Sequence, residues 1–347
     1  MRCNVPKEHC VEDLDAPPTY PLGDTTSFDL PMTSRSLHLF VKGRFSHGRV
    51  QVIASVNQNK ENVKVVLSTR FRQEGTVKDF FSLKEVSGRL KDEHGVEISM
   101  KMDIPKGHVY QDIKMIFPAP TGPTPTWVPK FEINVEGRHQ IHFKHGGHIA
   151  FGTLRVQVAE GDIYALPGYV EMDDGYIATE KGWIEGLFRS NNYLWARTWN
   201  GNIRAGFISE GTLSIRSEGS VDVDLTANQQ DSSIGNDISL HAADGNLDAD
   251  IFLNTTIDRP QYIISALSDC GNIHAKIHDM PEDASLNFAG NVSRDPGTCS
   301  IFIPYRLITS TTPYKFSSTS NERGKVIHFG AGEPMTELIS ENEYESS

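Results

Sequence analysis

Hydrophobic and polar residues alternate along most of the chain, from about residue 35 to about residue 330. A period of two is typical of strands with one buried and one exposed face, and Gly or Asn stands where turns are expected. The clearest segments are SLHLFVKGRF, GRVQVIASV, ENVKVVLSTRF, GVEISMKMDI, KFEINVEG and GTLRVQVAEGDIYA. The pattern predicts an all-β body over residues 35–331.

Two segments of this body depart from the alternation. Residues 76–93, TVKDFFSLKEVSGRLKDE, are the best candidate for an amphipathic helix, although Gly88 weakens it. Residues 117–129, FPAPTGPTPTWVP, cannot form a central strand because prolines lack the N–H that a ladder requires. We expect 117–129 to connect two parts of the body, with a possible boundary there.

Both ends of the chain have the composition of disordered tails. Residues 1–34 are polar, contain several prolines and show no apolar periodicity. Residues 332–347, GEPMTELISENEYESS, are acidic. We therefore expect two flexible tails around the β-rich body.

The strongest signal is a repeat in the C-terminal half. Gly219, Gly245, Gly271 and Gly297 are 26 residues apart, and each is followed by the same apolar–polar alternation. Gly324 recurs one residue late. A fixed period of this length indicates a repeat architecture. A glycine at each strand start suits a turn with positive φ or a close approach to the neighbouring coil.

A second strand keeps the same period, since Ile238 and Leu240 are followed by Ile264 and Ala266. Two short strands per repeat bury their apolar edge by stacking, which predicts a solenoid-like body. The alternative is a β-sandwich whose hairpins have similar lengths.

The Gly-Asn/Asp-Ile/Leu-x-Ala/Val pattern resembles a bacterial adhesin-like group of β-solenoid-like domains. The layout as a whole resembles fungal proteins with a Pro-Pro-x-Tyr tail ahead of such a domain, over about residues 35–330. The resemblance implies a scaffold or interaction domain, with no catalytic residues to carry over.

Charge and composition narrow the partners. The 347 residues carry a net charge of −12, which disfavours nucleic acid and anionic lipid as general partners. No apolar run approaches the ~20 residues of a membrane span, and the first residues lack a secretory signal's apolar core. Four cysteines are too few for a disulfide framework. We expect a cytoplasmic protein without membrane insertion; its oligomeric state stays open.

Pro17, Pro18, Thr19 and Tyr20 match the Pro-Pro-x-Tyr ligand of WW domains. The proline pair favours a polyproline II helix, and Tyr20 follows three residues after Pro17 on the same face. The motif predicts a WW-domain partner, such as a ubiquitin ligase or its adaptor. The alternative is a linker with incidental prolines.

Four histidines, His139, His142, His145 and His148, recur at every third position. Such density suggests a zinc, nickel or copper site. In a strand, however, this spacing sends successive side chains to opposite faces, and Gly146-Gly147 requires a turn. At best His142 would meet His148 across a hairpin, so we favour a strand pair with partly exposed histidines.

The 26-residue register also predicts a column of carboxylates. Asp222 would stack on Asp248 and then on His274, with like charges about 4.8 Å apart. A calcium ion would relieve the repulsion. Solvent, salt and His274 would do so as well, and we favour this solvated face over a metal site.

Aromatic residues concentrate between residues 182 and 201. They are Trp183, Phe188, Tyr193, Trp195 and Trp199, with Arg197 among them. Alternation places Tyr193, Trp195 and Arg197 on one face of a strand. Such a group suits a platform for sugars or peptides. It is also typical of a cap on the open end of a repeat stack, which we favour here.

No nucleophile elbow, P-loop, dinucleotide fingerprint, HExxH or CxxC motif occurs in the chain. Glu171, Asp173 and Asp174 form a carboxylate group that a β-helix glycosidase or lyase could use, although a loop of solvated acids is the simpler interpretation. We expect no cofactor.

The sequence thus favours a non-catalytic scaffold or interaction protein that carries a WW-domain docking motif. One alternative is a carbohydrate-active enzyme that uses Asp173, Asp174 or the Asp222–Asp248 column. Another is a surface or secreted adhesin-like protein, for which occupied glycans at the sequons of Asn254 or Asn291 would be evidence.

A peptide of residues 11–26 tests the docking motif. Titrated against a panel of WW domains, it should bind at least one domain with micromolar affinity, and its Tyr20→Ala version should not, because the tyrosine fills the specificity pocket. Absence of binding to every domain would reduce the motif to a linker.

Overall fold

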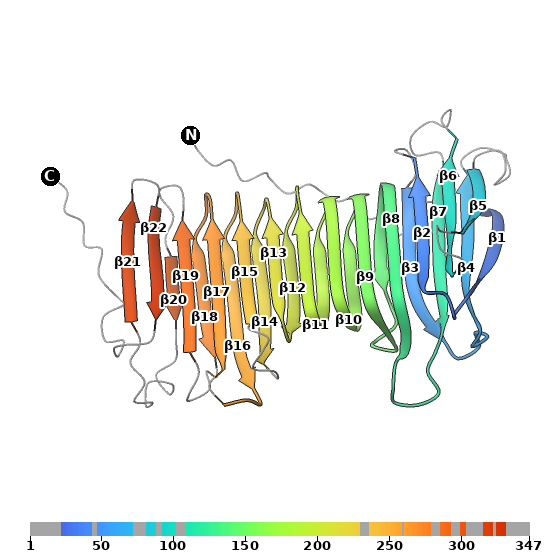
Figure 1. The fold of residues 1–347 in the computed structure, drawn as a ribbon. Helices are drawn as coiled ribbons and strands as arrows, with labels where there is room; N and C mark the ends of the chain where they lie inside the picture. Colours follow the sequence, from blue (N-terminus) through green and yellow to red (C-terminus); the bar gives the residue numbers. More distant parts are fainter. Residues whose placement is uncertain are drawn as a thin grey trace.

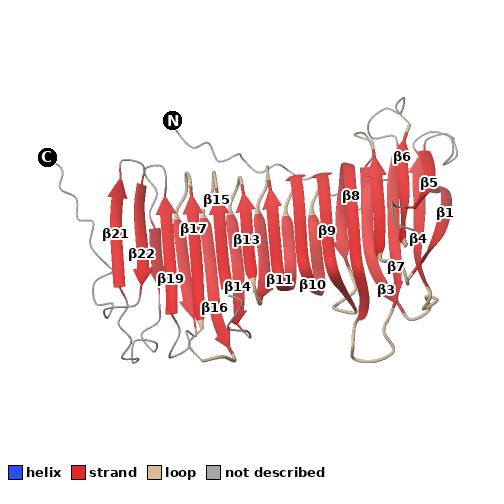
Figure 2. Cartoon of the chain, in the orientation of Figure 1, coloured by secondary structure: helices blue, strands red, loops and turns tan. Residues whose placement is uncertain are grey.

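The computed structural model describes residues 22–43, 47–71, 81–87, 92–101, 109–229, 236–258, 260–278, 285–292, 299–302, 315–321 and 324–330. These residues form 22 strands, and no helix occurs among them (Figures 1 and 2). The all-β prediction is confirmed. None of the described segments is a helix that could cross a membrane.

The strands form two rows that face each other across one core. The row called layer A here runs through β5 (Phe81–Ser87), β6 (Glu93–Met100), β2 (Ser36–Lys42), β9 (Ile149–Glu160), β13 (Thr212–Ser217), β15 (Asn236–Ala242), β17 (Gln261–Ser268), β19 (Ser285–Val292), β22 (Gly324–Gly330) and β21 (Lys315–Asn321). Layer B runs through β1 (Leu22–Pro31), β4 (Asn62–Phe71), β7 (Val109–Pro118), β3 (His47–Ser55), β12 (Ile203–Ser209), β14 (Val221–Gln229), β16 (Leu247–Thr255), β18 (Ile273–His278) and β20 (Cys299–Phe302).

Three long strands belong to both layers. They are β8 (Thr126–Phe143), β10 (Ile163–Lys181) and β11 (Ile184–Thr198). The first half of β11 pairs with β12 in layer B, and its second half pairs with β13 in layer A. These strands join the layers at the middle of the stack (Figure 1).

The core lies between the layers and is continuous from the β1 end to β18. It is built from the inward residues of each alternating strand, such as Leu39, Ile133, Val156, Ile215 and Ile251, which are fully or almost fully buried. Burial of one such side chain stabilises the fold by about 1.5–3 kcal/mol. The cluster includes Phe117 and Val128, so it continues through the predicted boundary near 117–129.

The 26-residue period appears directly in the strand register. Val221 pairs with Leu247, Leu247 with Ile273 and Ile273 with Cys299, all in parallel. The second strand behaves likewise, with Ile238 paired to Ile264. Alternate strands of this part of the chain pair in parallel, and two layers enclose the core.

Two elements differ from the repeat pattern. The predicted recurrence at Gly324 does not continue the parallel stack, because β22 pairs antiparallel with β19 and with β21. At the other end, β1 pairs antiparallel with β4, and β4 with β7. Antiparallel strands therefore close both ends of a parallel stack.

A column of glycines explains why the repeat begins where it does. A Cβ on Gly201 would lie 1.9 Å from the carbonyl oxygen of Gly182, and one on Gly271 would lie 2.1 Å from that of Gly245. Neither Gly201 nor Gly271 has a left-handed backbone, so close approach of neighbouring coils, not conformation, requires glycine there. The column also contains Gly219.

Buried hydroxyls beside this column bind the same backbone. The hydroxyl of Thr198 donates to the carbonyl oxygen of Gly182 at 2.9 Å, and that of Ser217 donates to Gly201 at 2.8 Å. Both side chains are fully buried. Because these bonds satisfy the turn carbonyls inside the stack, each coil is fixed to the one before it.

Three predictions about local structure need correction. The predicted tail of residues 1–34 is wrong from residue 22 onward, because β1 alternates and pairs with β4. The helix candidate 76–93 contains β5 and the first residue of β6 instead. The segment 117–129 contains the end of β7 and the start of β8, with residues 119–125 as the connection. Residues 1–21 and 332–347 lie outside the described residues.

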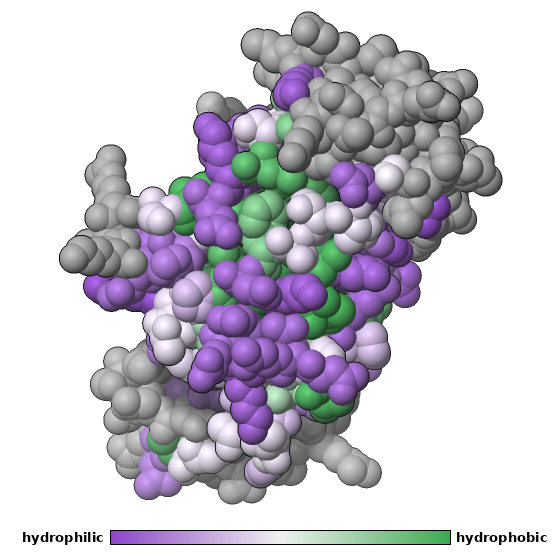
Figure 3. Space-filling model, turned by 90° about the vertical axis from the view of Figure 1, so that its right-hand side faces the viewer, coloured by the Kyte–Doolittle hydropathy of each residue, from purple (hydrophilic) through white to green (hydrophobic). Residues whose placement is uncertain are grey.

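Figure 3 looks onto the β1 end of the stack. Hydrophilic side chains cover much of the described surface there, with apolar side chains in patches between them. Capping the end with antiparallel strands that carry polar outer residues reduces the apolar surface a terminal coil would expose.

The glycine column predicts a steep cost for a methyl group. Gly201→Ala should lower the free energy of unfolding by more than about 2 kcal/mol, because a backbone oxygen must move. Gly122→Ala is the control, since no atom lies within 4 Å of its Cβ position. Urea unfolding measures both, and equal midpoints for the two variants would refute the role of the column.

Candidate functional site

The candidate site is a grid of side chains on the outer face of layer A, at the middle of the stack. Register places three neighbours on each of β10, β11 and β13 side by side. They are Asp174, Tyr176 and Ala178 on β10, Tyr193, Trp195 and Arg197 on β11, and Thr212, Ser214 and Arg216 on β13. We call these nine residues with Trp199 the platform. The predicted common face of Tyr193, Trp195 and Arg197 is confirmed, with Leu194 fully buried opposite.

Rings and guanidinium groups of the platform stack on one another. The rings of Tyr176 and Trp195 are parallel, with centroids 4.5 Å apart. The guanidinium of Arg197 lies 4.1 Å from the ring centroid of Trp199 and 5.7 Å from that of Trp195. Arg155 of β9 lies over Tyr176 at 5.1 Å. Cation–π contact with partly desolvated rings holds both arginines in fixed positions.

The arginines of this stack differ in their charge partners. Arg155 lies 3.9 Å from the carboxylate of Glu132, which also contacts His38 at 3.5 Å. Contact with His38, and then the charge of Arg155, lowers the pKa of Glu132. Arg197 forms no ion pair with any described residue, and its Nε is buried without a hydrogen-bond partner there. Its neighbour Arg216 lies 3.8 Å from Glu218.

The five aromatic residues predicted as one cluster divide into three groups, of which the first is Phe188, fully buried in the core against Phe207. Trp195 and Trp199 contact each other, and Tyr193 lies two residues before Trp195 on the same face. Trp183 lies apart, on the turn before β11, where its backbone N–H donates to Asp162. The predicted cap is wrong, because β11 has paired strands on both sides and lies mid-stack.

The four histidines do not form a site. β9 pairs in parallel with the first part of β8 and not as a hairpin with the second, so the proposed meeting of His142 and His148 is wrong. His142 stacks instead on Tyr164 of β10 at 4.9 Å. The turn at Gly146-Gly147 is confirmed by φ values of 56° and 80°.

His139 and His145 are buried, which corrects the prediction of partly exposed histidines. His139 Nε2 lies 2.9 Å from Oε1 of Gln111. The ring of His145 packs edge-on against Phe143 and Phe151, and neither of its nitrogens has a hydrogen-bond partner among the described residues. Burial lowers the pKa of His139 to about 3 and that of His145 to about 4, so both are neutral.

The carboxylate column lies on the outer face of layer B. Asp222 pairs with Asp248 and Asp248 with His274, as the repeat predicts. Arg204 of β12 lies 3.7 Å from Asp222, and both side chains are more than half exposed. The described residues contain no group of three or more His, Cys, Asp or Glu that could hold a metal ion. The geometry is that of a solvated face.

Glu171, Asp173 and Asp174 lie in strand β10, so their interpretation as loop residues is wrong. Glu171 lies 3.9 Å from Arg189, and Asp173 accepts a hydrogen bond from Asn191 at 2.8 Å. Asp174 belongs to the platform beside Tyr193.

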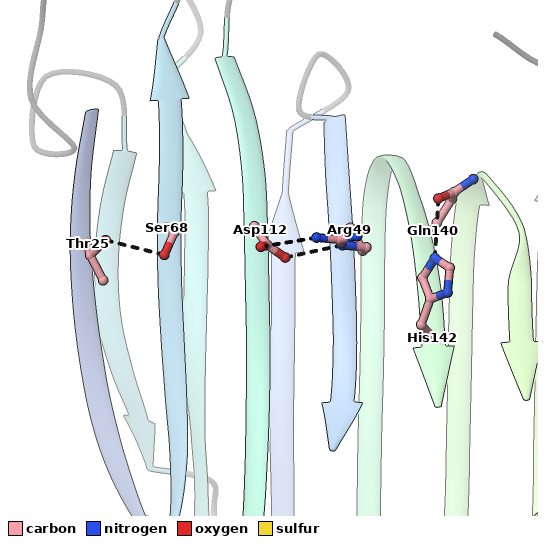
Figure 4. A network of polar contacts seen from close by, with 6 residues as sticks. All are labelled: Thr25, Arg49, Ser68, Asp112, Gln140 and His142. Atoms are coloured by element: carbon pink, nitrogen blue, oxygen red, sulfur yellow. Dashed lines mark hydrogen bonds and ion pairs between the residues drawn. The ribbon is translucent and has the colours of Figure 1, made fainter. Parts of the chain in front are cut away.

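Polar side chains also form a row across the first strands of layer B (Figure 4). Arg49 of β3 binds Asp112 of β7 through two contacts of 3.3 Å, and Thr25 of β1 lies 3.3 Å from Ser68 of β4. His142 lies 3.3 Å from Gln140. The first two contacts join neighbouring strands, and the third lies within β8.

Sequence reasoning missed the residues that complete the platform from other strands. Arg155 and Tyr176 belong to β9 and β10, and only the parallel register brings Arg155 beside Tyr176 and Tyr176 beside Trp195. Arg216 belongs to β13. They could have been found from the alternation of apolar and polar residues in those strands, if the strands had been aligned with one another without assuming a constant repeat length. Pro17, Pro18, Thr19 and Tyr20 lie outside the described residues.

No family model and no curated protein matches the chain. Several solved structures are similar to it, among them the following three. The "putative adhesin" from Bacteroides fragilis has a TM-score of 0.38 and 12% identity, covering 83% of this chain and 99% of that one. The "putative adhesin" from Parabacteroides distasonis has a TM-score of 0.38 and 10% identity, covering 80% and 97%. The "putative lipid binding protein" from Parabacteroides distasonis has a TM-score of 0.29 and 13% identity, covering 81% and 97%. With TM-scores this low, the likeness carries no inference about function.

The buried His145 predicts a pH-dependent loss of stability. Below about pH 6.5 the unfolded chain protonates this imidazole, whereas the folded protein does so only near its pKa of about 4. Stability therefore falls as pH drops through this window. In His145→Leu the fall between pH 7.5 and pH 5 should be smaller by on the order of 2 kcal/mol.

Urea unfolding at the two pH values gives the measurement. His274→Leu is the control, because His274 is exposed on the outer face of layer B and its replacement leaves the buried imidazole of His145 and its surroundings in place. An equal fall in His145→Leu and in the unsubstituted protein would contradict the role of His145.

Proposed function

We propose that this chain is a non-catalytic binding protein whose ligand contacts the platform. The observation that supports this most is Arg197, a π-stacked arginine without an ion-pair partner among the described residues, beside Arg216 and a set of aromatic and hydroxyl groups. A charged side chain that is held rigidly and is partly desolvated binds an oppositely charged ligand with little loss of conformational entropy, which favours a binding role over a role in solubility.

The platform is preorganised. Strand β11 has neighbours on both sides over the platform, so its backbone groups are engaged in the sheet and side chains alone face a ligand. Ring stacking further limits side-chain freedom. A ligand that binds a rigid face loses less conformational entropy on binding, which favours recognition.

The arrangement of the carboxylates excludes a catalytic pair that combines the two acidic sets. Glycosidases flank one bond with two carboxyl groups about 5–10 Å apart. Asp174 lies on the outer face of layer A, and Asp222 and Asp248 lie on that of layer B, with the core between them. No single bond can therefore lie between the two sets.

We keep the WW-domain scaffold as a second part of the proposal. Pro17–Tyr20 ends shortly before Leu22, where β1 begins, so a docked partner would be attached near the β1 end of the stack. The platform lies farther along the stack, in β10, β11 and β13. The two roles use different parts of the chain, and the peptide titration tests this part separately.

A ligand screen tests the binding role. Oligosaccharides, sugar acids and peptides should include at least one ligand that quenches the tryptophan fluorescence and is recovered chemically unchanged. Trp195→Ala should weaken its binding about tenfold or more, because it removes the ring on which Tyr176 and Arg197 stack.

Trp127→Ala is the matched control. This tryptophan is 51% exposed and lies at the start of β8, outside the platform. Unchanged affinity in Trp195→Ala, or equal weakening in both variants, would contradict a ligand site on the platform.

A further inference from the structure

The groups that the platform leaves free restrict its ligand. Tyr176 lies between Trp195 and Arg155, and Arg197 lies over Trp199 and Trp195, so each of these rings has at least one face engaged. On these faces, a sugar ring that stacks flat on tryptophan would have to displace the existing contacts. What remains for a ligand is the N–H groups of the arginines, the ring edges and short hydroxyl side chains.

Arg197 and Arg216 form the cationic part of this surface. They are direct partners in the parallel register of β11 and β13, so their Cα atoms are about 4.8 Å apart. Like charges on directly paired positions of neighbouring strands repel, and among the described residues only Arg216 of the two has a carboxylate nearby, that of Glu218 at 3.8 Å. The Nε atoms of both are buried without partners among the described residues. An oxyanion between the two guanidinium groups would relieve the repulsion and accept several N–H bonds.

Ser214 lies next to this pair, whereas two further hydroxyl groups and an acid lie at the other end of the platform, about 13 Å along the strands. Ser214 lies between Trp195 and the next coil, Thr212 lies beside Tyr193, and Asp174 lies beside Tyr193 on the other side. Partial burial raises the pKa of the Tyr193 phenol, which therefore stays protonated and can donate a hydrogen bond. The surface thus offers donors and acceptors for a polyhydroxylated ligand on the same face as its two cations.

We infer that the platform binds a sugar acid, with the ligand carboxylate between Arg197 and Arg216 and its nearest hydroxyls facing Ser214; in an oligosaccharide, the hydroxyls of further sugar residues face Thr212 and Asp174. This inference rests on the proposed binding function and specifies the ligand. The three residues per strand span about 13 Å and the three strands about 10 Å, which is the scale of a short saccharide rather than of a folded protein.

Charge and topology disfavour the other acidic ligands. The net charge of −12 repels a dense polyanion such as nucleic acid, whereas the repulsion on a ligand with a single carboxylate is small. An extended acidic peptide binds sheets by adding a strand to an open edge. Over the platform β11 has no open edge, since β10 and β13 pair with it on both sides.

The sugar acid has two sources with the same chemistry, a free monosaccharide or a residue of an oligosaccharide. Calorimetric titration of glucuronate against glucose tests the first, and 3′-sialyllactose against its neutral methyl ester tests the second. In each tested pair that binds, the acid should bind about tenfold or more tighter than its neutral counterpart. A short glutamate-rich peptide tests the macromolecular alternative.

Three variants locate the carboxylate. Arg197→Gln and Arg216→Gln should each bring the acid and neutral affinities within about twofold of one another. Arg204→Gln is the control, because Arg204 lies on the outer face of layer B and its loss changes the net charge equally. It should keep the tenfold preference. Urea midpoints verify that the variants are folded.

The outcomes separate the two proposals. Equal affinity for acid and neutral sugars in the unsubstituted protein, equal loss in Arg204→Gln, or tighter binding of the glutamate-rich peptide overturns the sugar-acid inference. If one of these results is obtained while Trp195→Ala still weakens the binding of a ligand from the screen, the platform remains the ligand site. If Trp195→Ala has no effect on any ligand, the proposed function fails as well.

Discussion

The close contact of backbones at the glycine column is the constraint on which the stack depends. At Gly182, Gly201, Gly219 and Gly271, the carbonyl oxygen of the previous coil occupies the space where a Cβ would lie. This contact fixes the register of each coil relative to the next one. A slip of one residue along a strand would bring a Cβ into the column and also turn every inward side chain outward.

The fixed register determines what gathers on the outer faces. On layer A it places Tyr176 beside Trp195 and Arg197 beside Arg216. On layer B it places Asp222 beside Asp248. The two outer faces therefore differ in chemistry: a stacked aromatic and cationic surface at the middle of layer A, and a solvated acidic column on layer B. A ligand that carries a negative charge meets the first favourably and the second unfavourably.

Sequence patterns predicted the C-terminal half of the fold well because its period is constant. The inward residues after Gly219, Gly245 and Gly271 lie where alternation and a 26-residue register place them. The column continues toward the N-terminus through Gly201, Gly182 and Gly161, but at shorter intervals, because the coils there have shorter turns. A fixed period cannot detect such a continuation. The bends that carry β8, β10 and β11 from one layer to the other have no periodic signal either.

The candidate site was predictable only in part. Tyr193, Trp195 and Arg197 are close in sequence, and alternation alone places them on one face. Their partners Arg155, Tyr176 and Arg216 come from other strands, so their proximity depends on register. The predicted cap failed because the sequence before residue 182 contains further coils that the 26-residue period does not reveal.

A crystal structure of the protein with 3′-sialyllactose tests most directly the claim that register builds a ligand site on layer A. We predict the ligand carboxylate within hydrogen-bond distance of the guanidinium groups of Arg197 and Arg216, with Tyr176 still stacked on Trp195. A ligand bound over the Asp222–Asp248 column or at either end of the stack, with the platform empty, would contradict it.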